Sequence, residues 1–185
     1  MAQLLSLRDL LQHEIDDLYS AEEQIIEALP KMVEAATHPE LKKALSNHLI
    51  VTRKQKHRLD EVRKIMESEP KGEPGFLEKI FGSNTKCKGT EGLIKEAEHI
   101  MKQTMEDTSV KDAAIIAAAQ KIEHYEISGY GTARAFAMQV GLSQVEALLT
   151  ETLNEEHDAD NELNALALFG VNLEAAGESN PSARG

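Results

Sequence analysis

Five acidic residues occupy positions where the apolar periodicity of a helix favours a leucine. They are Glu22, Glu123, Glu126, Glu156 and Asp160. Glu123 and Glu126 are three residues apart and Glu156 and Asp160 are four apart, so each pair shares one face of a helix. Because an unpaired buried carboxylate is unfavourable, several of them meeting inside a protein need protons, cationic partners or a metal ion. Carboxylate oxygens are hard ligands that suit iron or manganese better than zinc or copper.

Four long segments with helical periodicity must position these acids. They cover roughly residues 5–36, 39–68, 110–140 and 143–169. Short turns join the first to the second and the third to the fourth, so each pair forms an antiparallel hairpin. About 40 residues connect the two hairpins and carry a further helix at roughly residues 90–106. Two hairpins joined by one long crossover predict an all-α, ferritin-like antiparallel four-helix bundle with an extra helix in the crossover.

The ends of the elements follow from local signals. Gly141 is well placed to cap the third long helix at its C-terminus. Ser143, with Glu146 three residues later, predicts a capping box at the start of the fourth. Residues 1–170 are predicted to form one domain, and residues 171–185, which are small and polar, are predicted to form a flexible tail.

The hairpin turns predict the depth of each acid in the bundle. Reflecting the first helix through its turn places Glu22 level with about residue 53 of the second. Reflecting the third helix through Gly141 places Glu123 near residue 160 and Glu126 near residue 157, at about the depth of the acids on the fourth helix. The acids are therefore predicted to form a carboxylate cage in mid-bundle. A single glutamate in such a seam is more often at its edge, where the side chain reaches solvent.

The second helix supplies no acid to its seam, but it supplies His48 and Gln55. His48 could ligate a metal ion, or it could be a core histidine whose hydrogen bonds are satisfied. Ferritin-like sites draw a Glu-x-x-His pair from this helix and from the fourth. In this chain that spacing occurs only at Glu96 and His99 on the crossover helix, where a surface pair is the simpler interpretation.

The composition argues against several classes of function. The chain has 185 residues, of which 41% are hydrophobic, and a net charge of −12. So acidic a surface repels phosphate backbones and anionic lipids, and we expect no nucleic-acid or membrane partner. No apolar run approaches the roughly 18 residues of a membrane span. The N-terminal segment lacks the basic region of a signal peptide, so we do not expect it to be one.

Cys87 is the only cysteine, so it cannot form a disulfide within the chain. The simplest interpretation is a reduced, cytoplasmic protein. Lys86 and Lys88 flank the cysteine and could lower the pKa of its thiol. A passive thiol in a loop is the simpler interpretation.

Several stretches of the chain resemble the bacterial YciE/YciF family of ferritin-like proteins. They are DLYSAEEQ (17–24), PELKKAL (39–45), GLIKEAE (92–98), AAIIAAAQKIEHYEISGYGTARAFA (113–137) and LLTETLNEE (148–156). The resemblance implies a four-helix bundle related in fold to rubrerythrin, a homodimer, expression in stress responses and a dinuclear metal site. It also implies that Glu123 and Glu126 match the paired acids on the third bundle helix and that Glu22 matches the single acid of the first.

The chain departs from the family pattern on the second helix. The family tends to have His-Leu-Glu-Glu-Thr where this chain has His48-Leu49-Ile50-Val51-Thr52. Two acids are therefore missing, including the one at seam position 51. A site without them is predicted to bind one metal ion, to bind weakly or to be empty.

Two functions from different classes remain open. The first is a redox protein with at most two iron or manganese ions held by Glu22, Glu123, Glu126 and Glu156 with His48 or Asp160, and acting on peroxide or oxygen. The alternative is a non-catalytic helical dimer with a degenerate metal site, serving as a structural or interaction protein in a stress response. Mineral storage of the ferritin type is a weaker third hypothesis, because no surface for assembling a cage can be identified.

Overall fold

The computed structural model describes residues 4–68, 86–104 and 108–177, and these residues are helical with short connections. The helices are α1 (Leu7–Ala35), α2 (Pro39–Ser68), α3 (Lys88–Gln103), α4 (Thr108–Gln139) and α5 (Ser143–Leu166), followed by a π-helical segment, Ala167–Val171, and α6 (Asn172–Ala175). Most of the predicted bounds lie within a few residues of these. The break predicted after the second helix lies outside the described residues.

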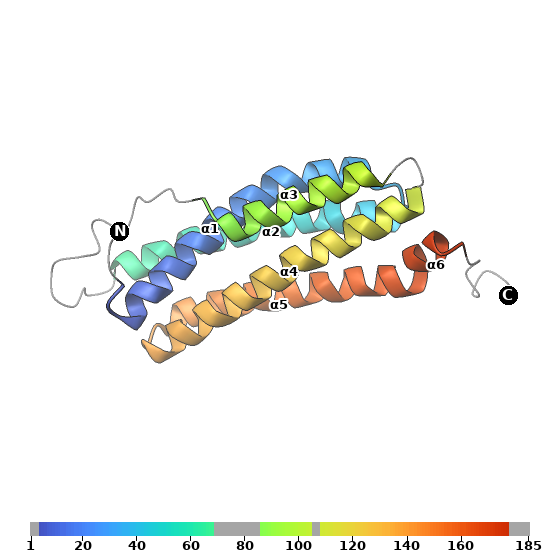
Figure 1. Ribbon diagram of the computed structural model, residues 1–185. Helices are drawn as coiled ribbons and strands as arrows, with labels where there is room; N and C mark the ends of the chain where they lie inside the picture. The colour runs from blue at the N-terminus through green and yellow to red at the C-terminus, as the bar shows by residue number, and fades with distance from the viewer. Residues whose placement is uncertain (1–3, 69–85, 105–107, 178–185) are drawn as a thin grey trace.

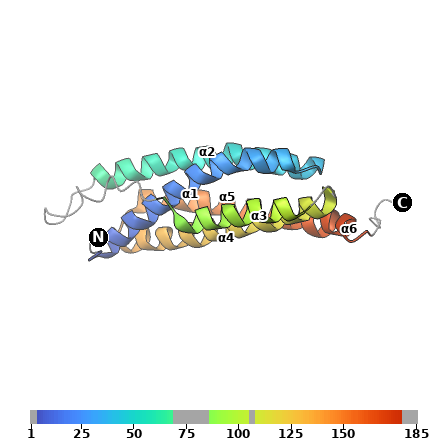
Figure 2. The same ribbon diagram turned by 45° about the horizontal axis from the view of Figure 1, so that its top comes forward.

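Two antiparallel hairpins, α1–α2 and α4–α5, pack side by side into a four-helix bundle (Figure 1). Each long helix contacts two others: α1 contacts α2 and α4, and α5 contacts α2 and α4. The crossover helix α3 lies on the outside of this bundle against α1 and α4 (Figure 2). The prediction of an all-α, ferritin-like bundle with an extra crossover helix is confirmed. No helix in the described part of the chain is both long and apolar enough to cross a membrane.

Buried Asp112 fixes the turn between α1 and α2, although nothing in the sequence singled it out. Its carboxylate on α4 accepts hydrogen bonds from the Thr37 amide at 2.7 Å, the Thr37 hydroxyl at 2.6 Å and the His38 amide at 2.8 Å. The last of these amides stands just before Pro39, where α2 begins. Asp112 therefore joins the two hairpins at one end of the bundle and sets their relative depth.

The turn between α4 and α5 follows one sequence signal and contradicts another. Gly141 has a φ of 78°, and the amides of Gly141 and Leu142 donate to the carbonyls of Met138 (3.2 Å) and Ala137 (2.9 Å). This is a Schellman C-cap, which confirms the role predicted for Gly141. The capping box predicted at Ser143 is wrong. The residue before the helix is Leu142, whose carbonyl already accepts the first helical hydrogen bond, and no side chain caps this end.

The helical chain continues beyond residue 170, where the sequence predicts a flexible tail. Val171 is buried, and Asn172–Ala175 form α6. The small apolar residues at 167 and 171 pack into the core at this end of the bundle. Residues 178–185 lie outside the described residues.

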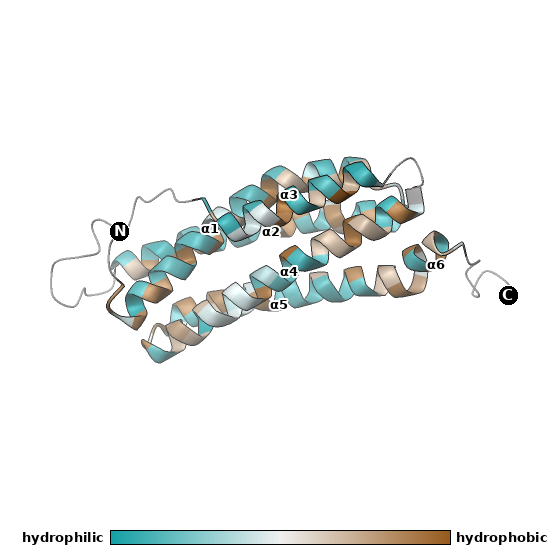
Figure 3. Ribbon diagram, in the orientation of Figure 1, coloured by the Kyte–Doolittle hydropathy of each residue, from teal (hydrophilic) through white to brown (hydrophobic). Residues whose placement is uncertain are grey.

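The core is divided in two along the bundle axis. One aliphatic cluster includes Ile25, Leu29, Leu45 and Ile115, and the other includes Leu11, Ile15, Leu59 and Leu149. Between them, each long helix presents buried polar residues instead of leucines. Figure 3 shows that hydrophobic and hydrophilic residues are interspersed along the helices. The bundle thus has a polar layer at mid-height that is closed above and below by aliphatic side chains.

Replacing Gly141 with alanine is expected to destabilise the protein by about 1 kcal/mol, because a Cβ is strained at positive φ. Urea unfolding measures the change. The matched control is Gly131→Ala in the middle of α4, where a new Cβ meets no atom within 4 Å. That substitution should stabilise the protein by up to about 1 kcal/mol, since alanine favours helix. Equal effects of the two substitutions would contradict the C-cap.

Candidate metal centre

The polar layer is built from residues that recur at helical spacing on the inner faces of the four long helices. α1 contributes one residue, α2 three, α4 two and α5 two, all of them buried. They are Glu22, His48, Thr52, Gln55, Glu123, Glu126, Thr152 and Glu156. Because four helices each present polar groups at the same depth, the layer surrounds the bundle axis on all sides.

Four residues of this layer converge on one point: His48, Glu123, Glu126 and Glu156. Each offers one ligand atom, and these atoms all lie within 4.8 Å of one another. Metal–ligand bonds of about 2.0–2.2 Å separate atoms on opposite sides of an ion by roughly 4.4 Å. The group therefore has the size of a site for a single ion, with one imidazole nitrogen and three carboxylate oxygens as donors.

Each of the four residues has a buried side-chain atom with no hydrogen-bond partner within the described residues. These atoms are His48 Nε2, Glu123 Oε2, Glu126 Oε1 and Glu156 Oε2. His48 Nε2 lies 3.2 Å from Glu123 Oε1 without a hydrogen bond between them. Buried polar atoms are nearly always paired, so several unpaired ones facing a common point indicate a missing cation or proton.

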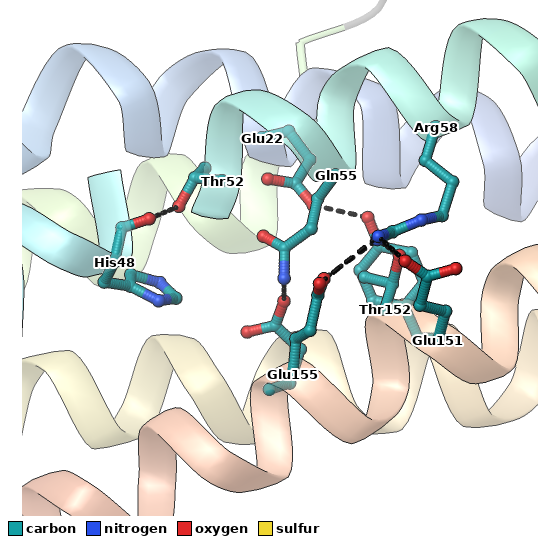
Figure 4. A network of polar contacts seen from close by, with 10 residues as sticks. Glu22, His48, Thr52, Gln55, Arg58, Glu151, Thr152 and Glu155 are labelled. Carbon is teal, nitrogen blue, oxygen red and sulfur yellow. Dashed lines mark hydrogen bonds and ion pairs between the residues drawn. The ribbon is translucent and has the colours of Figure 1, made fainter. Parts of the chain in front are cut away.

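The ion pairs of Arg58 are with acids outside this group. Arg58 on α2 donates to Thr152 at 2.7 Å and to Glu155 at 2.8 Å, and it also pairs with Glu151 (Figure 4). Figure 4 shows the imidazole of His48 on the other side of Gln55 from this arginine. Of the two adjacent acids on α5, Glu155 therefore pairs with an arginine, while Glu156 turns into the layer.

Glu22 borders the four-residue group without belonging to it. The Tyr130 hydroxyl donates a hydrogen bond to Glu22 Oε1, while Oε2 has no partner. The Gln55 amide donates in the same way to Glu156 Oε1. Gln55 was expected in the seam of the second helix, and a polar residue at such a position was the available signal for its role.

Asp160 lies outside the converging group. Its carboxylate accepts from Gln120 Nε2 at 3.2 Å and lies 3.4 Å from His124 Nε2, near the surface between α4 and α5. These contacts agree with the prediction that residue 160 of α5 lies level with Glu123 of α4. Asp160 stands one turn further along α5 than Glu156, and this turn carries it away from the other acids. Of the six residues predicted as ligands, the structure brings four together, sets Glu22 beside them and separates Asp160.

The electrostatics of the layer follow from burial. The pKa values of Glu22 and Glu123 are raised well above the usual range, mainly by burial and secondly by the charge of Glu156. The pKa of Glu126 is also raised well above the usual range, mainly by burial and secondly by the charge of Glu22. Burial raises the pKa of Glu156 to about 7. Burial lowers the pKa of His48 to about 4. Without an ion and near neutral pH, these pKa shifts favour protons on Glu22, Glu123 and Glu126 and leave Glu156 partly ionised, while the His48 imidazole is neutral, with a nitrogen lone pair available to a cation.

A cavity of about 210 Å³ lies between α2 and α5 and reaches this layer. Its lining includes His48, Glu123 and the half-buried Val51. Exposed Asp158 and Glu162 also line it, so the cavity extends to the surface.

Cys87 and the Glu96/His99 pair lie away from the layer's ligand group. Cys87 is buried rather than in an open loop, and its thiol donates to Asp17 at 3.1 Å and lies 3.0 Å from the Tyr125 hydroxyl. It precedes the first residue of α3, which begins earlier than predicted. Glu96 forms an ion pair with Lys121 on the surface, which confirms the surface interpretation.

Residues 6–176 match the protein family described as a domain of unknown function, DUF892. The chain belongs to this family. It is 41% identical to Protein YciF of Escherichia coli (strain K12) over 170 residues, which make up 92% of this chain and 95% of that protein. The resemblance found in the sequence is thereby confirmed.

Solved structures of similar proteins have the same fold. YcfI from Rhodopseudomonas palustris, for which a structural role has been proposed, is 42% identical with a TM-score of 0.78, covering 90% of this chain and 98% of that one. The E. coli stress protein YciF is 40% identical, with the same TM-score and coverage. A protein from Xanthomonas campestris, 16% identical with a TM-score of 0.64 over 92% of this chain and 94% of that one, shares the fold alone.

The ion-free protein is expected to lose more than about 1 kcal/mol of stability as the pH rises from 6.5 to about 8. In this interval the folded protein holds more protons than the unfolded chain, because burial raises the pKa of Glu156 to about 7 and the pKa of Glu22, Glu123 and Glu126 well above the ordinary value of 4.5. His48 acts in the opposite direction only between pH 4 and 6.5, because its pKa falls from 6.5 to about 4. Urea unfolding of chelator-treated protein measures the dependence.

Glu126→Gln is the matched variant, because its amide has no proton to release. Its stability should vary less with pH over the same interval. A wild-type stability that is flat or rises from pH 6.5 to 8 would contradict protonated carboxyl groups in the layer.

Proposed function

We propose that this protein binds one divalent metal ion, iron or manganese, at the centre of its helix bundle. The observation that carries the proposal is the convergence of His48, Glu123, Glu126 and Glu156, each of which also has a buried side-chain atom without a hydrogen-bond partner within the described residues. One imidazole and three carboxylates, without a thiolate, suit iron(II) or manganese(II). Ion binding would displace the protons that burial otherwise keeps on these acids.

The residues around the group would position it. Gln55 orients Glu156, and Tyr130 holds Glu22 beside it. The aliphatic clusters on either side exclude water from the axis. A bound iron or manganese ion would supply one-electron chemistry towards a small oxidant such as peroxide or oxygen. The E. coli relative is described as a stress protein, which supports a stress-associated role for this chain. A cytoplasmic homodimer, as expected from the sequence, stays a prediction.

We propose one ion in place of two because α2 provides a single ligand. The Thr52 hydroxyl donates to the His48 carbonyl at 2.8 Å, and the Gln55 amide is engaged by Glu156. The next inward position towards the cavity is Val51, which has no donor atom. A second ion beside Glu22 would therefore lack an anionic ligand from this helix.

A structural role is the second candidate, and specific observations favour it. Protonated carboxyl groups with hydrogen bonds from Tyr130 and Gln55 can occupy the layer without a metal. The similar protein YcfI has a proposed structural role. If this candidate is correct, replacing Glu22, Glu123 and Glu126 together with glutamine should leave the protein stable and functional, whereas under the metal proposal the same change abolishes binding.

Metal analysis after dialysis against Mn²⁺ is expected to find about one ion per wild-type chain, because one group of ligands converges. Glu123→Gln should weaken binding by more than about tenfold, since it removes one of the four donors. Asp160→Asn is the matched control and should leave binding unchanged. Loss of binding in Asp160→Asn but not in Glu123→Gln would contradict the four-residue site.

Val51→Glu is expected to raise the stoichiometry from one ion to two. Val51 lines the cavity beside His48 and Glu123, so a carboxylate at this position would add an anionic ligand from α2. Titration with Mn²⁺ followed by mass spectrometry under native conditions measures the number of ions. Ile50→Glu, at an exposed position one residue earlier, is the control and should leave the number at one. An unchanged stoichiometry in Val51→Glu would contradict the role of Val51 in limiting the site.

A further inference from the structure

We propose that the cavity between α2 and α5 is the route by which a divalent cation reaches the centre of the bundle from solvent. This inference rests on the metal site proposed above and assigns to it a path and a selectivity for cations. Three features of the cavity support it: two residues of the converging group at its inner end, acids without an ion pair in the described residues at its outer end, and mainly apolar walls between them, where Glu155 is paired with Arg58.

The inner end of the cavity is formed by two of the converging residues. His48 is 9% exposed and Glu123 is 2% exposed, and both line the cavity. His48 Nε2 and Glu123 Oε2 have no hydrogen-bond partner within the described residues. An ion that moves inward along the cavity therefore reaches the side chains of His48 and Glu123 first, and Glu126 and Glu156 each offer a ligand atom within 4.8 Å of a ligand atom of these two.

The outer end carries acids that are not neutralised. Asp158 and Glu162 are one helical turn apart on the exposed side of α5, and the described residues contain no ion pair to either. Glu155, between them and the polar layer, pairs with Arg58. Low-dielectric walls focus the field of such charges into a cleft, which raises the local concentration of cations and lowers that of anions.

The walls between the two ends include Val51, Ala159 and Leu163. Asn47 and Glu155 also line the cavity, and the Glu155 carboxylate is paired with Arg58. A water molecule occupies about 30 Å³ of liquid, so a volume of about 210 Å³ has room for an ion that keeps several of its waters. Ala159 and Val51 face the narrow space between the helices with side chains small enough to leave it open.

A second cavity provides a contrast. It measures about 200 Å³, lies between α1 and α3, and reaches none of the four converging residues. Its lining contains Lys31, Lys86 and Lys95 together with acids that pair with them. Cavity size alone therefore does not distinguish the proposed route. The proposed route is distinguished by the combination of Asp158 and Glu162 at its mouth with His48 and Glu123 at its inner end.

The test compares the rate of Mn²⁺ uptake in two variants of equal net charge. Asp158→Asn with Glu162→Gln removes the charge from the mouth of the cavity. The matched control, Glu34→Gln with Glu67→Gln, removes two exposed acids that do not line it. Rapid mixing with Mn²⁺, followed by the loss of the free-ion electron paramagnetic resonance signal, gives the rate and the final occupancy.

At low ionic strength the mouth variant is expected to take up Mn²⁺ about 5–10-fold more slowly than the wild type, and the control less than about twofold more slowly. The difference should disappear at high salt, because screening removes steering. The final occupancy should be the same in all three proteins, since the ligands are untouched. A mouth variant that loads as fast as the control would overturn the route.

A second variant tests passage independently of charge. Ala159→Leu narrows the space between α2 and α5 and should slow uptake at every salt concentration, with unchanged final occupancy. Unhindered uptake in this variant would overturn the route as well. These failures differ from failure of the metal site itself, in which the wild-type protein would bind no Mn²⁺ at any time and both proposals would fall.

Discussion

Four carboxyl side chains lie in the middle of an aliphatic core, and the penalty for burying them determines how the rest of the structure is arranged. Moving one ion out of water costs several kcal/mol even after relaxation. Glu22, Glu123, Glu126 and Glu156 are each at most 2% exposed, and the nearest arginine binds other acids. Such a group is stable only with protons on its oxygens or with a cation among them. The raised pKa values correspond to the protonated group, and the buried atoms without hydrogen-bond partners are suited to binding a cation.

The fold brings these groups to a common depth and encloses them above and below with aliphatic side chains. Each hairpin has a short, fixed turn: Asp112 holds the first, and the C-cap at Gly141 holds the second. With the turns fixed, residues at mid-helix in all four segments must meet at mid-bundle. The two aliphatic clusters then close the layer from both ends, and the cavity beside Val51 is where the packing between α2 and α5 leaves space.

The helices and their pairing could be predicted from the sequence because apolar periodicity and short turns are local signals. The same signals placed Glu123, Glu126 and Glu156 at one level. They failed for Asp160, because one helical turn of displacement along α5 is enough to bring its carboxylate to Gln120 and His124. They also failed for Asp112 and for the burial of Cys87, because those positions depend on contacts between segments that are far apart in the chain. The capping box at Ser143 was wrong because the preceding C-cap had already determined where α5 begins.

The central claim is that the converging side chains of His48, Glu123, Glu126 and Glu156 are metal ligands and not merely protonated core residues. Anomalous X-ray diffraction from crystals soaked in Mn²⁺ tests it most directly. The account predicts one anomalous peak inside the bundle, at bonding distance from His48 Nε2 and from an oxygen of each of the three glutamates. Peaks confined to surface carboxylates, with the inner acids hydrogen-bonded to one another, would contradict it.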